Sequence, residues 1–288
     1  MKKIYIVGSI NTDLVITAPY MPKSGETLTG ENFFTARGGK GANQAVAAAR
    51  LGGKVLMCGC VGDDLFGDEA IASLKKENID VSHIRRIINT PTGTAVIVVV
   101  NGDNRIILDK GANAYLTEKD IDDFIKDAEE GDIYLSQLEN PIEVIGYGLK
   151  KAKDKGMYVI LNPAPASKEI IPFLKYCNLL TPNETETEML GGEKELLKTA
   201  ETLLITLGSK GFKIVTNSAE KCYPCIKVNA VDTTAAGDTL CGGLVARLAA
   251  GDNVENAARF GSKAASIACT KKGAQPSIPT FTEVREFK

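Results

Sequence analysis

A loop of small residues between two aspartates is the part of this sequence best suited to chemistry. Asp232-Thr-Thr-Ala-Ala-Gly-Asp238 precedes a predicted small-residue helix from Thr239 to Ala250. Small side chains let successive backbone amides point into one cavity and bind phosphoryl oxygens. We expect Asp238 to stay ionised, because the helix dipole and amide donors favour its carboxylate form. A carboxylate beside an anion-binding loop suits phosphoryl transfer, and an ordinary helix-capping aspartate is the alternative.

A second glycine-rich segment also leads into a predicted helix. Gly38-Gly-Lys-Gly-Ala-Asn43 comes directly before the helix expected from Gln44 to Leu51, so this turn suits an anion or a sugar, or it is simply a helix start. Its Lys40 is expected either to contact phosphate or to be solvated. The segment lacks the GxxxxGK[ST] pattern of a Walker A loop, and Gly8 does not begin a GxGxxG fingerprint.

Polar residues follow several predicted strands, where ligands of open α/β sheets usually bind. Thr206-Leu-Gly-Ser-Lys-Gly211 follows one strand. Pro182-Asn-Glu-Thr-Glu186 follows another, and its side chains suit magnesium-bound phosphates, although helix capping by Asn183 is an equally simple explanation. A third set suits the hydroxyls of a polyol, or consists of exposed loop residues: Asn11, Asp13 and Glu139.

Charge and histidine content narrow the function further. The 288 residues include 34 Lys and Arg against 36 Asp and Glu, for a net charge of -2. This balance gives no surplus for gripping nucleic acid or an anionic membrane, so we expect small-molecule partners. Because His83 is the sole histidine, a Ser-His-Asp triad, a histidine-rich metal site and a histidine base are excluded, and acid-base chemistry falls to carboxylates.

The cysteines and apolar runs predict a cytoplasmic protein. Asn11 and Asp13 come too early for a signal peptide, and the longest apolar run, Ala95 to Val100, is far shorter than the ~20 residues that span a bilayer. Seven scattered cysteines suit reduced thiols better than disulfides. Only Cys222 and Cys225 form a CxxC, and we expect neither zinc nor a redox motif there.

Short apolar runs alternate with helical patterns along the chain. The predicted buried strands are Ile4 to Val7, Val55 to Val61, Ile133 to Leu135, Val159 to Leu161, Leu179 to Thr181 and Leu203 to Thr206. The predicted helices between them are Ala42 to Leu51, Phe66 to Glu77, Glu118 to Ala128 and Pro141 to Lys155. This alternation indicates a mostly parallel sheet covered on both faces.

Three β-rich segments interrupt this alternation: Leu14 to Ala18, Thr27 to Phe34 and Thr94 to Leu108. We expect them to form a small second sheet. The sequence has no linker that would separate independent domains. We therefore predict one α/β domain over 1–288 with a small β lid, whose strands come from about 12–36 and 93–109.

Seven motifs in order resemble the ribokinases among the PfkB-type carbohydrate kinases, nearly end to end. They are Gly8-Ser-Ile-Asn-Thr-Asp13, Gly38-Gly-Lys-Gly-Ala-Asn43, Val61-Gly-Asp-Asp64, Asn162-Pro-Ala-Pro-Ala166, Thr181-Pro-Asn-Glu184, Asp232 to Asp238 and Lys272-Gly-Ala-Gln-Pro-Ser277. Both signatures of the family are present, GGxGxN and DTxxAGD, with Ala236 where many relatives carry glycine. The resemblance implies a ribokinase-like three-layer α/β/α domain with a mostly parallel central sheet. It also implies a β-sheet lid over the sugar that joins a homodimer.

The resemblance also implies ATP-dependent phosphorylation of D-ribose at the 5-hydroxyl, with Asp238 as base, Mg²⁺ accompanying the nucleotide and K⁺ as activator. The implied anion hole is Ala235, Ala236, Gly237 and Asp238. The implied sugar contacts are Asn11, Asp13, Gly39, Lys40, Gly41, Asn43, Glu139 and Asp238. The implied ATP contacts are Asn183, Thr206, Gly208, Ser209, Gly211, Gly237 and Ser262. The implied K⁺ positions are Asp232, Thr234, Ala268, Lys271, Gly273 and Ser277, mostly through backbone carbonyls, and Glu186 would act on Mg²⁺ through water.

Two departures from the family pattern concern the nucleotide side. Asn183 to Thr206 spans only 24 residues, so we expect a trimmed helix and loop on the flank of the sheet. Ser262 stands where relatives carry a larger polar residue toward the adenine, so looser base selectivity is expected.

Other functions stay open from the residues alone. A kinase for 2-deoxyribose, another sugar or a nucleoside would differ from a ribose kinase by a few pocket contacts. A non-catalytic sugar-binding regulator would keep the fold, and intact Asp238 argues against it. A nicotinamide-dependent enzyme is disfavoured by the missing fingerprint.

Overall fold

Short buried strands build the large sheet of this chain, whose computed structural model describes residues 1–287. The nine strands run in the order β13 (Glu220–Tyr223), β12 (Phe212–Val215), β11 (Thr202–Thr206), β10 (Leu179–Leu180), β9 (Tyr158–Leu161), β8 (Ile133–Ser136), β1 (Lys3–Val7), β4 (Lys54–Gly62) and β5 (Asp80–Ile87). The pairs from β11 to β5 are parallel, and β12 and β13 add an antiparallel edge.

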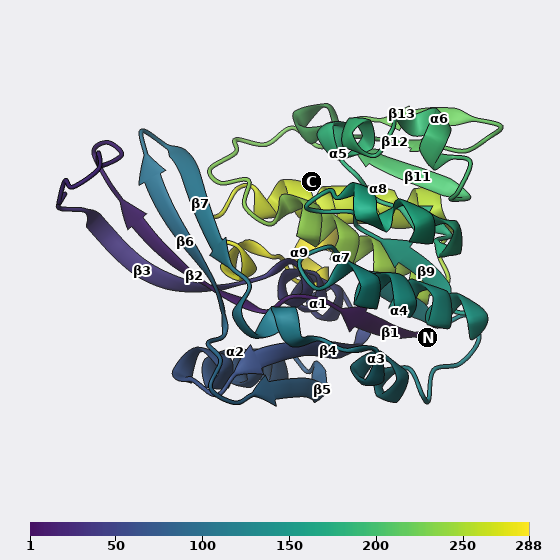
Figure 1. Ribbon diagram of the computed structural model, residues 1–288. Coiled ribbons are helices and arrows are strands. Elements are labelled where there is room, and N and C mark those ends of the chain that lie inside the picture. Colours follow the sequence, from purple (N-terminus) through teal and green to yellow (C-terminus); the bar gives the residue numbers. More distant parts are fainter. Residues whose placement is uncertain (288) are drawn as a thin grey trace.

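Helices cover both faces of this sheet (Figure 1). One face packs on α1 (Lys40–Arg50), α2 (Leu65–Lys76), α7 (Ala236–Ala249), α8 (Val254–Ala268) and α9 (Phe281–Glu286). The other packs on α3 (Glu118–Phe124), α4 (Ile142–Asp154) and α6 (Glu193–Leu196), with α5 (Glu184–Met189) following β10. Alternation along β1 divides the core, since Ile4 and Ile6 join the first cluster while Tyr5 and Val7 join the second.

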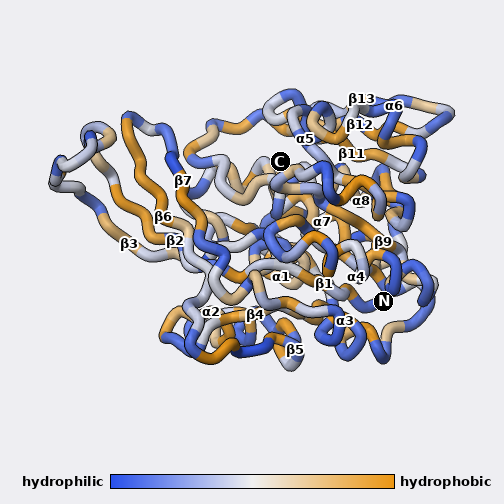
Figure 2. Tube along the Cα trace, viewed as in Figure 1, coloured by the Kyte–Doolittle hydropathy of each residue, from blue (hydrophilic) through white to orange (hydrophobic). Residues whose placement is uncertain are grey.

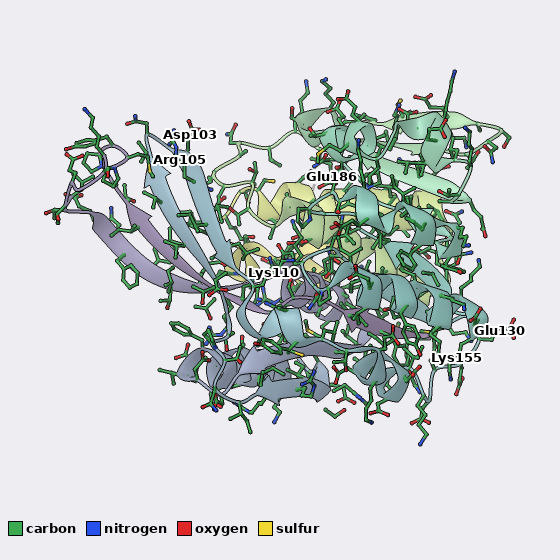
Figure 3. The ribbon with its side chains drawn as sticks, in the orientation of Figure 1. Asp103, Arg105, Lys110, Glu130, Lys155 and Glu186 are labelled. Carbon is green, nitrogen blue, oxygen red and sulfur yellow. The ribbon has the colours of Figure 1, made fainter. Side chains whose placement is uncertain are left out.

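A four-stranded sheet projects from this α/β body (Figure 1). Its order is β3 (Glu31–Gly38), β2 (Asn11–Thr17), β6 (Gly93–Val100) and β7 (Asp103–Asp109). It is mixed, because β2 and β6 are parallel while β3 and β7 pair antiparallel at the edges. Figure 3 shows Asp103 near its outer tip and Lys110 at its base, where the chain re-enters the body.

The predicted three-layer α/β class with a mostly parallel sheet and a small second sheet is confirmed. Several boundaries were wrong. The helix expected to start at Ala42 or Gln44 starts at Lys40, because the amides of Lys40 and Gly41 find acceptors in Glu139 and Ser9. The strand expected over Thr27 to Phe34 is β3, which starts at Glu31 and is exposed along most of its length, so burial leaves no pattern there.

Other differences lie in segments of mixed polarity. The segment Thr94 to Leu108 is a hairpin that turns at Asn101 and Gly102, both with positive φ. The helix expected to reach Ala128 is α3 and ends at Phe124. Strand β5 was not predicted, since polar residues interrupt its apolar ones.

The cysteines of the CxxC motif lie far from the other pair of closely spaced cysteines. Cys222 lies on β13 and Cys58 and Cys60 on β4, with six strands between them. Within residues 1–287, no helix combines the length and apolar character needed to cross a membrane.

Candidate active site

The start of α7 places a buried carboxylate beside a turn of small residues. Ala235 caps the helix in a left-handed conformation, with φ 58° and ψ 14°. Asp238 follows in the first turn and is 7% exposed. Its Oδ2 accepts a hydrogen bond from Asn43 Nδ2 at 3.0 Å and its Oδ1 accepts one from Gln44 Nε2 at 2.9 Å. The helix-capping alternative is therefore wrong, because Asp238 binds side chains of α1.

The surroundings of Asp238 determine its basicity. Burial raises its pKa, whereas the charge of Lys40 and the two amide donors lower it, and the net shift is upward. This corrects the expected stabilisation by helix amides, because the donors are side-chain carboxamides and desolvation outweighs them. A carboxylate with a raised pKa is a better proton acceptor than an ordinary aspartate.

A cavity of about 170 Å³ lies against Asp238 and the start of α7. It is lined by Lys40, Asn162, Ala164, Thr181, Asn183, Glu186, Thr206, Thr233, Ala235, Ala236, Gly237, Asp238 and Cys241. The first residues of α7 line one wall, where the amides of a helix N-terminus favour anions, although the Ala236 amide already donates to the Thr233 carbonyl at 3.2 Å. The cavity has the elements of a phosphate site.

Lys40 supplies positive charge to this cavity. Burial lowers its pKa, but the carboxylates Asp238, Glu139 and Glu186 outweigh burial and raise it. The ammonium therefore faces the cavity fully charged rather than standing solvated on the surface, which was the alternative. Such a cation suits the oxygens of a phosphoryl group.

Asn183 and Glu186 also line the cavity, at the start of α5 (Figure 3 labels Glu186). Asn183 caps the helix by accepting from the Glu186 amide at 2.8 Å, and Glu186 Oε2 accepts from the Asn183 amide at 2.8 Å. Asn183 therefore caps α5 and lines the cavity at the same time. The segment from Asn183 to Thr206 is short, yet its two ends pair as a β-bridge and line the same cavity.

A second cavity of about 580 Å³ adjoins the first and shares Thr206, Thr233, Ala236 and Gly237 with it. Apolar side chains such as Ile226, Val228 and Leu240 contribute to its walls. Of the seven residues expected to contact ATP, six line this cavity: Thr206, Gly208, Ser209, Gly211, Gly237 and Ser262. The seventh, Asn183, lines the smaller one. Together the cavities suit an elongated ligand with an apolar end and an anionic end.

Asp13 and Glu139 form the polar edge on the far side of Asp238. Burial raises the pKa of Asp13 to about 6, with contributions from the charges of Glu139 and Asp238. Glu139 Oε2 accepts from the Lys40 amide at 3.2 Å and from the Ser9 hydroxyl. These carboxylates meet because α1, β2 and the loop after β8 converge here.

Glycines allow the close packing at this edge. Gly39 has φ 88°, and a Cβ atom there would lie 2.7 Å from the Asn11 amide nitrogen. A Cβ on Gly38 would lie 2.4 Å from the Asp13 carboxylate, and one on Gly41 would lie 2.5 Å from the backbone of Gly8. The GGKG sequence is therefore needed for the backbone to approach Asn11 and Asp13.

Asp232 joins the loop before α7 to the segment after α8. Its Oδ1 accepts from the amide and hydroxyl of Thr234, at 2.9 and 2.6 Å, and its Oδ2 accepts from the Gly273 amide at 2.8 Å. Burial favours the neutral form of Asp232, but these hydrogen bonds outweigh burial and lower the pKa of Asp232. Lys271 directs its ammonium at Glu283, 2.7 Å away. An ammonium has no lone pair for a cation, so this residue could contribute only its backbone carbonyl.

Sequence reasoning missed several residues that the structure places at the site. Gln44 contacts Asp238, and Asn162, Thr181 and Cys241 line the 170 Å³ cavity. Gln44 had a weak signal as the residue after Asn43, but a glutamine inside a predicted helix is usually unremarkable.

Comparison with known proteins gives a consistent result over the whole chain. Residues 1–281 match the pfkB family carbohydrate kinase description. A ribokinase of Haemophilus influenzae is 43% identical, over 99% of this chain and 98% of its own length. A deoxyribokinase of Salmonella typhimurium is 36% identical, over 99% of this chain and 98% of its own. The structure of the Arabidopsis thaliana ribokinase complexed with ribose and ATP superimposes with a TM-score of 0.87 at 29% identity, covering 100% of this chain and 99% of that one.

Proposed function

The chain belongs to the pfkB family of carbohydrate kinases, and from that premise we propose that it transfers a phosphoryl group from ATP to the 5-hydroxyl of D-ribose. The observation that carries this proposal is the position of Asp238. This buried carboxylate lies between the polar edge of Asp13 and Glu139 and a cationic cavity that continues into a larger, partly apolar one. A base between a polyol site and a phosphate site is the arrangement that phosphoryl transfer to an alcohol needs.

Each group then has a separate task. ATP occupies the 580 Å³ cavity with its phosphates directed into the 170 Å³ cavity. Ribose lies against Asn11, Asp13, Gly39, Asn43 and Glu139. Asp238 accepts the proton of the attacking hydroxyl, while the amides of Ala235, Gly237 and Asp238 and the Lys40 ammonium stabilise charge on the transferred group. Because the site is buried, these electrostatic interactions are stronger than they would be in water.

Two metal ions fit the residues present. Glu186 has one carboxylate oxygen committed to helix capping and the other available at the cavity wall, which suits a water-mediated contact to Mg²⁺. When bound with ATP, Mg²⁺ neutralises charge on the phosphates. We also propose that K⁺ binds beside the ionised Asp232, whose carboxylate accepts from the amides of Thr234 and Gly273. Its further ligands would be oxygens of Thr234, Ala268, Lys271, Gly273 and Ser277, because oxygen-only ligation suits K⁺.

A second substrate, 2-deoxyribose, is favoured by the similarity to a deoxyribokinase. The test is kcat/KM with ATP for ribose, 2-deoxyribose, fructose and adenosine, with NMR of the product to locate the phosphate. We expect ribose to have the highest value and to yield the 5-phosphate. A higher value for 2-deoxyribose would transfer the assignment to that sugar, and no turnover on any of the four would overturn the kinase proposal.

We propose that the four-stranded sheet is both the lid over the sugar and the contact of a homodimer. Ile106 is 59% exposed and Ile107 is 71% exposed, and as neighbours on β7 they point to opposite faces of the sheet. Figure 2 shows hydrophobic residues along its strands. Exposed apolar side chains on both faces of a sheet indicate that each face contacts something else. The sugar site would lie against one face and a second copy of the chain against the other.

Sedimentation of the wild type and of Ile106→Asp and Ile107→Asp tests this arrangement. We expect the wild type to be a dimer. Of the two variants, the one whose substitution faces away from the sugar site should be a monomer. A monomeric wild type at micromolar concentration contradicts it. We also propose that the protein is cytoplasmic, because its seven cysteines are free thiols, which suit a reducing compartment.

A further inference from the structure

We propose that Gln44 is a positioning residue for Asp238, held in place by a relay of buried carboxamides that ends on the backbone carbonyl of Thr181. The inference rests on the proposed function, since Gln44 acts only through the base. It explains why a glutamine in the middle of a core-facing helix is completely buried.

The relay is a continuous set of hydrogen bonds. Gln44 Nε2 donates to Asp238 Oδ1 at 2.9 Å and to Asn162 Oδ1 at 3.1 Å. Gln44 Oε1 accepts from Gln137 Nε2 at 2.6 Å. Asn162 Nδ2 donates to the carbonyl of Thr181 at 2.8 Å. Both N–H groups and the oxygen of the Gln44 amide are thereby engaged, which fixes its orientation.

The direction of the relay follows from its last member. A backbone carbonyl can only accept, so Asn162 must turn its NH₂ group toward Thr181 and its Oδ1 toward Gln44. Gln44 must then present its NH₂ group to Asn162, and the second hydrogen of that group points at Asp238. Turning the Gln44 amide over would set oxygen against oxygen on both sides.

The consequence for Asp238 is an imposed protonation pattern. Gln44 donates to Oδ1 and Asn43 donates to Oδ2, so each oxygen already faces an N–H group and both bonds favour the ionised carboxylate. The remaining lone pairs are the ones available to a substrate hydroxyl. Gln44 therefore sets both the orientation of the carboxylate and the pH at which it begins to work as a base.

The other charged and titratable groups around Asp238 stay the same when Gln44 is changed. Lys40 comes from α1, Glu139 from the loop after β8, Asp13 from β2, Glu186 from α5 and Cys241 from α7. Among these groups, Lys40 favours the ionised form of Asp238 and Glu139 opposes it. Removing one donor should thus raise the pH at which Asp238 gains its proton.

The test is the single-turnover rate of ribose phosphorylation between pH 5 and 9 for Gln44→Met and Gln44→Glu. Methionine keeps the length and removes the donor, while glutamate places a second carboxylate against Asp238. We expect the acidic midpoint of the pH–rate profile to rise by about one unit in Gln44→Met and further in Gln44→Glu. The rate should approach the wild-type value at high pH, which a purely structural role would not produce.

Two more variants keep the test decisive if Gln44 variants fold poorly. Asn162→Leu should move the midpoint in the same direction by a smaller amount, because Gln44 keeps its bond to Asp238 but loses one orienting partner. Asn178→Leu is the matched control, since it also removes two hydrogen bonds, to the Val159 amide and Glu201, but on the far side of β9. It should lower the melting temperature without moving the midpoint.

The outcomes separate this inference from the proposed function. Folded Gln44 and Asn162 variants that retain the wild-type midpoint would overturn the relay while ribose phosphorylation stands. If the wild type itself does not phosphorylate ribose, the proposed function fails first. A midpoint that moves equally in Asn178→Leu would also refute the relay, because loss of stability alone would then explain it.

Discussion

Replacing Asp238 with asparagine keeps the shape of the side chain and removes its charge and its proton-accepting oxygen. A positioned general base typically contributes about 10²- to 10⁴-fold to a rate. At about 1.4 kcal/mol for each tenfold change, this is about 3–5 kcal/mol of the activation barrier. Asp238 is only 7% exposed, so water is poorly placed to replace it. We expect kcat to fall by at least about 10²-fold while ribose and ATP still bind.

The hydrogen bonds to Asp238 also determine how far the substitution lowers the free energy of unfolding. Asn43 Nδ2 and Gln44 Nε2 both donate to Asp238, at 3.0 and 2.9 Å, so the new amide nitrogen must face one of these donors. Losing one buried hydrogen bond costs about 1–3 kcal/mol, and removing a desolvated charge offsets part of that cost. At roughly 2–4 °C for each kcal/mol, the melting temperature should fall by at most about 10 °C, so the variant stays folded at 25 °C.

The assay is ADP release in the presence of ribose, with isothermal titration calorimetry for each ligand and a thermal melt. Asp252→Asn is the matched control, because Asp252 pairs with Arg247 at the other end of α7, at 2.8 and 3.0 Å. It should lose stability and keep kcat. An Asp238→Asn enzyme whose kcat is within tenfold of the wild type would refute the assignment of the base.

Four further predictions concern the site and its packing. Because burial raises the pKa of Asp13 to about 6, the KM for ribose should rise as the pH falls below 6, and Asp13→Asn should abolish this dependence; a flat wild-type profile would argue against Asp13 as a sugar ligand. Since the folded-state pKa of Asp13 lies above its unfolded value, its ionisation should make unfolding easier as the pH rises from about 4 to 6, which melts of both proteins can measure. Gly242→Ala should lower stability by about 1–3 kcal/mol in denaturant unfolding, because the new Cβ would lie 2.3 Å from the Ala47 Cβ where α7 crosses α1. Replacing Na⁺ with K⁺ at fixed ionic strength should raise activity in the wild type and have no effect in Asp232→Asn, and an equal rate in both salts would remove the cation proposal.

Much of the fold was accessible from the sequence because the central strands are buried on both faces. Runs such as Ile4 to Val7 and Val159 to Leu161 are apolar throughout, which is the pattern that a parallel sheet requires. The projecting sheet was harder to delimit. Most of β3 is solvent-exposed, so its residues show no alternation of apolar and polar side chains that would mark the strand. Its start was therefore placed four residues too early.

The sequence by itself determined the chemistry available to this protein. A single histidine left acid-base work to carboxylates, and the two loops of small residues before α1 and α7 marked where backbone amides and glycines gather. These are local properties, because a loop's residue types decide which backbone conformations and which titrating groups it offers.

Only the tertiary structure decided how that chemistry is arranged. Asp238 and its donors Asn43 and Gln44 are 195 and 194 residues apart, and the packing of α1 against α7 through Gly242 brings them into contact. The same packing buries the carboxylate and raises its pKa, which the helix start alone did not indicate. Burial and long-range hydrogen bonds depend on which elements meet, and a linear pattern of residues carries little information about that contact.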